Sequence, residues 1–136
     1  MDNHLVLVSH GRFCEELKKS IEMIMGTQKE IYAVGLLPEE SVKVKDFRVN
    51  FEKTIRGLKK VTVLADLMGG TPCNVVSQLI LEGKEIDLYA GMNMPMIISF
   101  INNQILEEDS SLVDKGRKNI IHVNKYLKVN LIDLED

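Results

Sequence analysis

Three short segments of the sequence contain residues that can do chemistry together: SHG at 9–11, DLMGGTPCN at 66–74 and AGMNMP at 90–95. A neutral histidine becomes a prepared nucleophile when a carboxylate holds one ring N–H and leaves the lone pair of the other nitrogen free. The first segment supplies His10, and the second begins with Asp66, a suitable carboxylate. These two residues therefore predict a histidine nucleophile, provided that the fold brings them together.

The residues after Asp66 indicate what kind of group the histidine would carry. Gly69 and Gly70 have no side chain that would keep a phosphate away from the backbone. Thr71 adds a hydroxyl group and is predicted to be the N-cap of a helix that begins at Pro72. A helix N-terminus carries about half a positive charge, which favours an anion. The sequence thus predicts a site at which a phosphoryl group is carried on His10.

The elements that position these residues follow from the hydrophobic pattern. Short apolar runs alternate with stretches of helical spacing, which is typical of an α/β protein with a parallel sheet. Strands are predicted at His4 to Ser9, Glu30 to Leu36, Val61 to Leu67 and Glu85 to Ala90. The first, third and fourth runs are almost continuously apolar, so we expect these strands to be covered on both faces.

The segments between the strands have the spacing of amphipathic helices. The apolar faces of the first two predicted helices consist of Phe13, Leu17, Ile21 and Ile24, and of Val44, Phe47, Phe51, Ile55 and Leu58. Further helices follow Thr71 and the stretch from Asn93 to Pro95. The charged stretch from Glu107 to Lys118 is expected to be a surface connection or a short helix, and a weaker apolar run from Asn119 to Val129 predicts one more strand.

The order of the strands decides whether the polar segments meet. Ligands of open parallel sheets bind at the carboxyl edge, where the strand order changes direction. The predicted order is 2-1-3-4, which makes the first strand the neighbour of the third, roughly 5 Å away. His10 and Asp66 then face each other across adjacent strand ends.

Composition narrows the possible functions. The 17 basic residues are scattered among 20 acidic ones and the formal charge is −3, which argues against nucleic acid as a partner. No apolar run approaches the roughly 20 residues that cross a bilayer. We expect a cytoplasmic protein with one domain, residues 1–136, and no membrane span. Cys14 and Cys73 are not spaced like metal ligands or a redox pair, so no metal or cofactor is expected.

A few residues near the three segments are candidates for contact with a protein partner. Arg12 is a candidate for contact with phosphate or with a protein partner, and solvation alone explains it equally well. Met68 and Met94 are candidates for an apolar rim on which a partner docks. Histidine phosphatases also place a histidine after the first strand, but in an Arg-His-Gly pattern, whereas Ser9 precedes the histidine here. No nucleotide-binding G-x-G-x-x-G or Walker A loop follows a strand.

Taken together, the three segments resemble the IIA component of the mannose-type sugar phosphotransferase system, over about residues 4–105. The resemblance implies that His10 accepts phosphate at Nε2 from the carrier protein HPr and passes it to a separate IIB component. It also implies that Asp66 orients the ring and that Thr71 with the adjacent backbone contacts the phosphate. IIB would in turn link the protein to a membrane complex of IIC and IID components.

The resemblance has further implications for fold and context. It implies a three-layer open sheet of mainly parallel strands flanked by helices. It also implies a homodimer in which a C-terminal antiparallel strand, here from Asn119 to Val129, is exchanged. Related domains occur in phosphoenolpyruvate-dependent dihydroxyacetone kinases and in transcription activators, so a subunit of such a kinase or a regulatory module is the alternative function. The transported sugar is not indicated by these residues.

Overall fold

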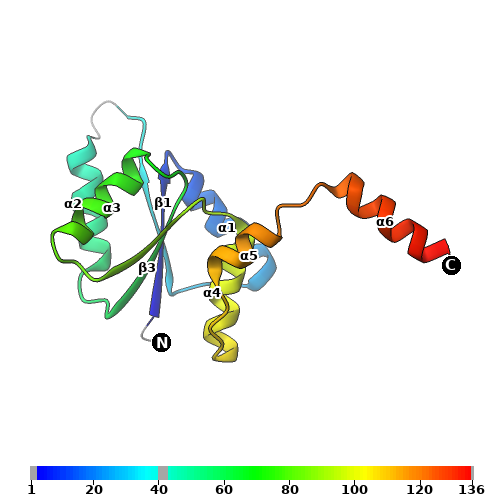
Figure 1. The fold of residues 1–136 in the computed structure, drawn as a ribbon. Coiled ribbons are helices and arrows are strands. Elements are labelled where there is room, and N and C mark those ends of the chain that lie inside the picture. The colour runs from blue at the N-terminus through cyan, green and yellow to red at the C-terminus, as the bar shows by residue number, and fades with distance from the viewer. Residues whose placement is uncertain (1–2, 40–42, 136) are drawn as a thin grey trace.

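The fold is a parallel sheet between two layers of helices (Figure 1). The computed structural model describes residues 3–39 and 43–135, with side chains described up to residue 130. The elements in chain order are β1 (Asn3–His10), α1 (Phe13–Met25), β2 (Ile31–Leu36), α2 (Val44–Ile55), β3 (Lys60–Ala65), α3 (Thr71–Leu81), β4 (Ile86–Ala90), α4 (Met94–Leu106), α5 (Leu112–Lys118) and α6 (Val123–Glu135). The strand order is β2-β1-β3-β4, which confirms the predicted topology.

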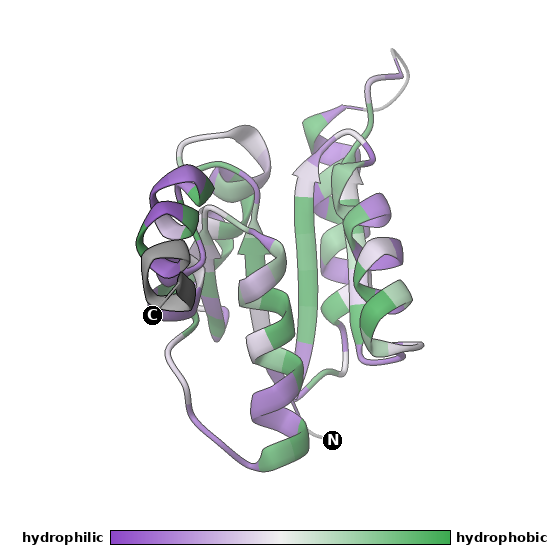
Figure 2. Ribbon diagram, turned by 90° about the vertical axis from the view of Figure 1, so that its right-hand side faces the viewer, coloured by the Kyte–Doolittle hydropathy of each residue, from purple (hydrophilic) through white to green (hydrophobic). Residues whose placement is uncertain are grey.

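The two central strands form the middle of the core because both of their faces are covered. Successive side chains of a strand point to opposite faces, so Leu5 and Leu7 of β1 pack with α1 and α4, while Val6 and Val8 pack with α2 and α3. In Figure 2 the central strand is hydrophobic along most of its length, whereas the helices carry both hydrophobic and hydrophilic residues. This double burial explains the near-continuous apolar runs in the sequence.

The amphipathic helices pack as predicted in their central turns and differ at their ends. Leu17 and Ile21 of α1 are buried, as are Phe47 and Phe51 of α2. The outer members of the predicted apolar faces are exposed: Phe13, Ile24 and Val44 are 51%, 62% and 48% exposed. Each lies in the first or last turn of its helix, where the sheet no longer covers the side chain.

The prediction that the fourth strand is covered on both faces holds only in part. Tyr89 packs against the core on one face, and Ile86, Leu88 and Ala90 pack against the core on the other, but these side chains are only partly buried. None of the five residues of β4 is buried. Within the described sheet β4 is the last strand in the order and pairs with β3 alone, so its outer edge has no strand to cover it. The sequence did not predict this incomplete burial, because an apolar run does not reveal a strand's position in the sheet.

The predicted strand from Asn119 to Val129 is wrong, and exchange of a strand between two copies is not shown. Residues 119–122 have no regular structure, and α6 begins at Val123. The spacing of Val123, Tyr126 and Leu127 fits the 3.6-residue period of a helix better than the two-residue period of a strand. In Figure 1, α6 projects away from the sheet. The preceding charged stretch contains the short helix α5, one of its two predicted forms.

None of the helices in the described part of the chain combines the length and the apolar character needed to cross a bilayer.

Candidate functional site

The site lies where β1 and β3 end side by side. His10 is the last residue of β1, and Asp66 directly follows the last residue of β3. The strands remain paired up to this point, because Val8 lies opposite Ala65 and the backbone N–H of Asp66 donates to the carbonyl oxygen of Val8 at 3.2 Å. The predicted meeting of His10 and Asp66 is therefore a direct result of the strand order.

One carboxylate oxygen of Asp66 holds the histidine in two places. Oδ2 lies 2.7 Å from Nδ1 of the His10 ring, and the backbone N–H of His10 donates to the same oxygen at 2.9 Å. A carboxylate beside Nδ1 favours the tautomer that carries its proton on Nδ1. The lone pair of Nε2 is then left free, at a ring whose side chain is 49% exposed.

Asp66 is suited to remain ionised in this role. Its partial burial raises the pKa of the carboxyl group, but the hydrogen bonds from the backbone amide and ring of His10 outweigh the burial, and the net pKa is lowered. The Asp66 side chain is only 14% exposed. The pair thus consists of a shielded carboxylate and an exposed imidazole.

The turn into α3 passes directly beside the histidine ring. A Cβ atom on Gly70 would lie 2.7 Å from Cε1 of His10, so the absence of a side chain lets the backbone pack against the ring. Gly69 has a φ of 82°, a conformation that favours glycine. These contacts bring the N-terminus of α3, with its free N–H groups, close to Nε2.

The start of α3 differs by one residue from the prediction. Gly70 is the N-cap, in an extended conformation with φ −75° and ψ 159°, and Thr71 is the first residue of the helix. Pro72 is accordingly the second helical residue. Thr71 is partly buried and also lines a surface groove between α2 and α3. The predicted N-cap role of Thr71 was wrong. Glycine is also a favoured N-cap residue, and here Gly70 takes that position without a side-chain hydrogen bond.

The candidate docking residues lie in three different environments. Met68 is 79% exposed and follows Asp66 by two positions. Met94 is partly buried against the core between the sheet and α4. The guanidinium group of Arg12 donates to the carboxylate of Glu39 at 3.1 Å. Of the two methionines, only Met68 thus presents a largely exposed apolar side chain.

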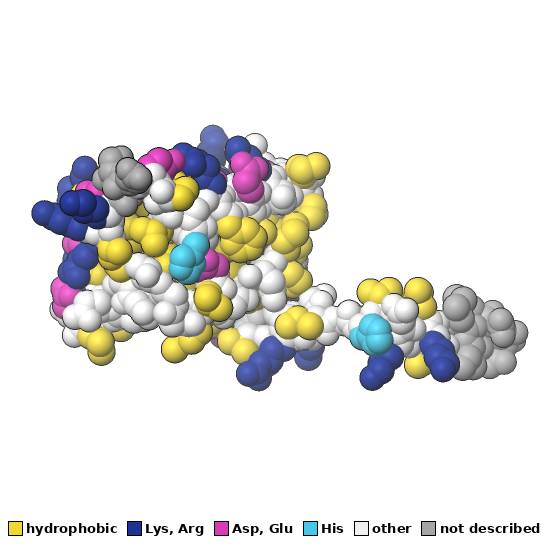
Figure 3. Space-filling view, turned by 90° about the horizontal axis from the view of Figure 1, so that it is seen from above, with side chains coloured by type: hydrophobic (Ala, Val, Ile, Leu, Met, Phe, Trp, Pro, Cys, Tyr) yellow, Lys and Arg dark blue, Asp and Glu magenta, His cyan; other side chains and the backbone are white. Residues whose placement is uncertain are grey.

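Two apolar residues near the site were missed as candidates. Phe13 and Leu67 are 51% and 59% exposed, and they follow His10 and Asp66 closely in the chain. Figure 3 views this edge of the sheet, on which a histidine and an acidic side chain lie among hydrophobic side chains. The signals in the sequence differ: Leu67 extends the apolar run of β3 past Asp66, and Phe13 is the first member of the apolar pattern of α1.

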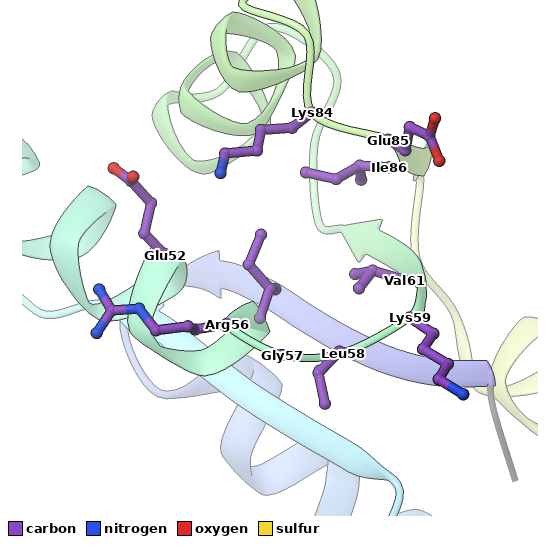
Figure 4. Close-up of a pocket in the computed structure, with 10 residues that line it drawn as sticks. Glu52, Arg56, Gly57, Leu58, Lys59, Val61, Lys84, Glu85 and Ile86 are labelled. Carbon is purple, nitrogen blue, oxygen red and sulfur yellow. The ribbon is translucent and has the colours of Figure 1, made fainter.

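A separate cavity lies at the opposite edge of the sheet. It has a volume of about 350 Å³ and is lined by the C-terminal end of α2, the start of β3 and the residues before β4. In Figure 4, Lys84 and Ile86 extend over the opening, whereas Lys59 and Glu85 point away from it. The cavity is therefore separate from His10, and its mixed charges do not select an anion.

Comparisons with known proteins agree with this arrangement. A family described as "PTS system fructose IIA component" (EIIA-man) matches residues 4–115. The fructose-specific EIIA component of Bacillus subtilis is 30% identical over 111 residues, which are 81% of this chain and 74% of that protein. The mannose-specific EIIAB component of Escherichia coli K12 is 28% identical over 96 residues, but the match covers only 29% of its length.

A solved structure is similar over almost its whole length. The phosphotransferase system component EIIA from Streptococcus agalactiae is 28% identical with a TM-score of 0.77, and the similarity covers 90% of this chain and 98% of that chain. The fold, the strand order and the family match all point to the same group of proteins. Because the match spans residues 4–115, the chain belongs to the mannose-type IIA family of the sugar phosphotransferase system.

Proposed function

We propose that this protein is a phosphocarrier of a sugar phosphotransferase system, in which His10 accepts a phosphoryl group from HPr and passes it to a separate IIB component. The observation that carries the proposal is the His10–Asp66 pair, with Nδ1 held at 2.7 Å and the ring about half exposed. A donor that is itself a protein requires such an exposed acceptor. Family membership supports the general activity, a phosphotransferase.

The transfer step follows from the His10 tautomer that carries its proton on Nδ1 and leaves Nε2 free. The lone pair of Nε2 of His10 attacks the phosphorus of the phosphohistidine on HPr, and a new N–P bond forms. The old N–P bond breaks, and its electron pair returns to the imidazole of HPr. The proton on Nδ1 of His10 stays beside Asp66, which stabilises the positive charge that develops on the ring. Transfer to IIB is the same step in the opposite direction.

The surroundings of His10 are proposed to stabilise the phosphoryl oxygens. The N-terminus of α3 lies beside the ring, and an anion next to a helix N-terminus is stabilised by the free N–H groups and the helix dipole. We assign this role to the backbone of Gly69 and Gly70 and to Thr71. The N–H of Gly70 donates to the carbonyl oxygen of Leu67 at 3.1 Å in the resting protein, so Gly70 contributes mainly by letting the phosphate approach the backbone. Since donor and acceptor are both N–P bonds, positioning and charge stabilisation are the main tasks of the protein.

The partners are proposed to dock on the exposed residues around this edge of the sheet. Met68 and Leu67 present apolar surface beside the histidine, and Arg12 and Met94 remain candidates at its periphery. We place the protein in the cytoplasm, where IIB would connect it to a membrane complex of IIC and IID. The chain is proposed to act as one domain, residues 1–136.

A homodimer is also proposed, now without an exchanged strand. The support is the apolar surface of α6, where Val123, Tyr126 and Leu127 are 56%, 57% and 51% exposed. A second copy would cover such a surface. Sedimentation equilibrium of the full chain would give twice the monomer mass, and a monomer at tens of micromolar would contradict this part of the proposal.

Phosphoryl transfer tests the function directly. The protein is incubated with labelled phosphoenolpyruvate, Enzyme I and HPr, and the expected result is a label that is lost in acid and stable in base. His10→Ala should take up no label, while His122→Ala, the matched control on the exposed residues before α6, should be labelled like the wild type. Equal labelling of His10→Ala and the wild type would contradict the proposal.

A second step identifies the acceptor of the phosphoryl group. Addition of IIB to the labelled protein should release the label, whereas transfer only to a dihydroxyacetone kinase subunit would favour the alternative function.

A further inference from the structure

The turn that carries His10 has a second set of contacts, on the side away from Asp66. Only Gly11 and Arg12 separate the end of β1 from the start of α1. Gly11 has a φ of 58°, so the chain reverses sharply directly after the histidine. In so short a turn, a displacement of Gly11 is passed on to the backbone of His10 and hence to its ring.

Ser9 fixes this turn from inside the protein. Its side chain is fully buried, and its Oγ atom accepts a hydrogen bond of 2.9 Å from the backbone N–H of Cys14. This N–H lies in the first turn of α1, where backbone donors have no acceptor within the helix. The N-cap residue Arg12 makes no capping hydrogen bond with its side chain. Ser9 therefore caps α1 from the end of the strand.

Gly35 of β2 makes room for the same turn. It lies opposite Ser9 in the parallel ladder, and a Cβ atom on Gly35 would overlap the carbonyl oxygen of Gly11. The neighbouring residue Leu36 accepts a hydrogen bond of 2.7 Å from the N–H of Gly11. Strand β2 thus holds the turn and also fixes how closely it can approach.

From these contacts we infer that Ser9 and Gly35 are positioning residues for His10, which keep its Nδ1 atom aligned with Oδ2 of Asp66. Neither residue reaches the exposed nitrogen. Ser9 acts through the start of α1, and Gly35 acts through the carbonyl group of Gly11. The inference concerns the orientation of the His10 ring in the unphosphorylated protein. It rests on the proposed function only where the rate of phosphoryl transfer is measured.

The test measures the tautomer of His10 in the unphosphorylated full-length protein by long-range ¹H–¹⁵N NMR. The wild type should carry its proton on Nδ1. Ser9→Ala removes the acceptor for the N–H of Cys14, and Gly35→Ala displaces the carbonyl group of Gly11. Both variants should therefore have a smaller population of the tautomer protonated on Nδ1. Transfer from HPr should slow about tenfold, since a small misplacement of a reacting group is costly. The effect should appear in kcat rather than KM. Ser9→Thr keeps a hydroxyl group and should restore both readouts.

Two control variants separate positioning from general loss of stability. Ser77→Ala removes a partly buried hydroxyl group that donates to the carbonyl oxygen of Cys73 at 2.8 Å within α3. Gly26→Ala strains a residue with φ 82° at the end of α1, where a Cβ atom would meet nothing. Both controls should retain the wild-type tautomer even if their melting temperatures fall.

The inference is overturned if folded Ser9→Ala and Gly35→Ala keep the wild-type tautomer, or if the controls change it equally. Should Ser9→Ala fail to fold, Ser9→Cys preserves the volume and weakens the acceptor, and a wild-type tautomer in that variant would overturn the role of Ser9. If the wild type takes no phosphoryl group from HPr, the proposed function fails, but the NMR result on the resting protein still decides about Ser9 and Gly35.

Discussion

Strand β1 carries a histidine–carboxylate pair at each end, and the two pairs differ in which partner is exposed. At the amino end, Nδ1 of His4 lies 2.9 Å from Oε2 of Glu30, with side chains 15% and 38% exposed. At the carboxyl end, Nδ1 of His10 lies 2.7 Å from Oδ2 of Asp66, with side chains 49% and 14% exposed. Similar distances thus accompany opposite patterns of burial.

The two pairs have the same kinds of group, so the burial of each partner, more than the composition of the pair, decides what chemistry is possible. A shielded carboxylate orients an exposed ring, whose free nitrogen a docking protein can reach. A shielded ring with an exposed carboxylate leaves little of the ring for a docking protein to reach, and the ring of His4 lies near that of Tyr32, with centroids 6.2 Å apart. We therefore interpret the amino-end pair as structural and the carboxyl-end pair as functional.

Exchanging each histidine for alanine should give the largest contrast. His10→Ala removes the nucleophile and should lower phosphoryl transfer by at least about 10³-fold, to the detection limit. His4→Ala should be phosphorylated at the wild-type rate, because its pair lies at the far end of β1. The initial rate of label uptake from phosphorylated HPr measures both. Comparable losses in the two variants would abolish the distinction between the pairs.

Neutralising each carboxylate sharpens the comparison. Asp66→Asn keeps the shape but loses the charge and no longer favours the Nδ1–H tautomer, so transfer should slow by about 10² or more. Glu30→Gln should change the rate less than twofold, because this pair lies at the far end of β1 from His10. Circular dichroism confirms folding of both variants. A wild-type rate in Asp66→Asn would show that the carboxylate only stabilises the turn.

The backbone packed against the functional ring gives a smaller effect. Gly70 has an ordinary φ of −75°, so alanine is strained there by contacts of its Cβ atom, most severely with Cε1 of His10 at 2.7 Å and less so with the carbonyl oxygen of Leu67 at 3.3 Å. Gly70→Ala should displace the ring and slow transfer about tenfold. The control is Gly83→Ala, which strains a residue with φ 105° in open space and should lower only the melting temperature. If both variants transfer at the wild-type rate, the ring does not depend on this contact.

The smallest effect is the pH dependence of stability. The pKa of Asp66 is lowered in the folded protein, so its contribution to stability is complete above the unfolded pKa of about 3.9. That contribution is lost as the pH falls through the depressed folded value. The free energy of unfolding of the wild type should therefore fall more steeply below about pH 4 than that of Asp66→Asn. Parallel urea-unfolding curves for the two proteins over this range would contradict the assigned pKa direction.

The sequence was sufficient to predict the pair itself. The ends of β1 and β3 can be read from their apolar runs, and parallel strands place their carboxyl ends at one edge, so the meeting of His10 and Asp66 follows from strand order alone. Gly70 was assigned to phosphate, whereas its contact with the ring depends on the path of the chain into α3. The ion pair of Arg12 with Glu39 joins residues on two loops, and no local pattern reveals it.

The C-terminal third was harder to predict for a different reason. A short run such as NIIHV, residues 119–123, has the apolar content of a strand, and the helical spacing only becomes clear once Tyr126 and Leu127 are included. The exposure of β4 depends on its position as the last described strand in the sheet, which the run itself does not encode. The hydrophobic patterns therefore predicted the parallel core and its strand order, but not the helix at the C-terminal end or the incomplete burial of the edge strand.

The most direct test of the central claim identifies the nitrogen that carries phosphate. The phosphorylated protein is prepared with HPr, and the ¹⁵N-labelled ring of His10 is followed by NMR. The account predicts a phosphorus bond at Nε2 and a proton that remains on Nδ1 beside Asp66. A phosphoryl group on Nδ1, or on any residue other than His10, would contradict it.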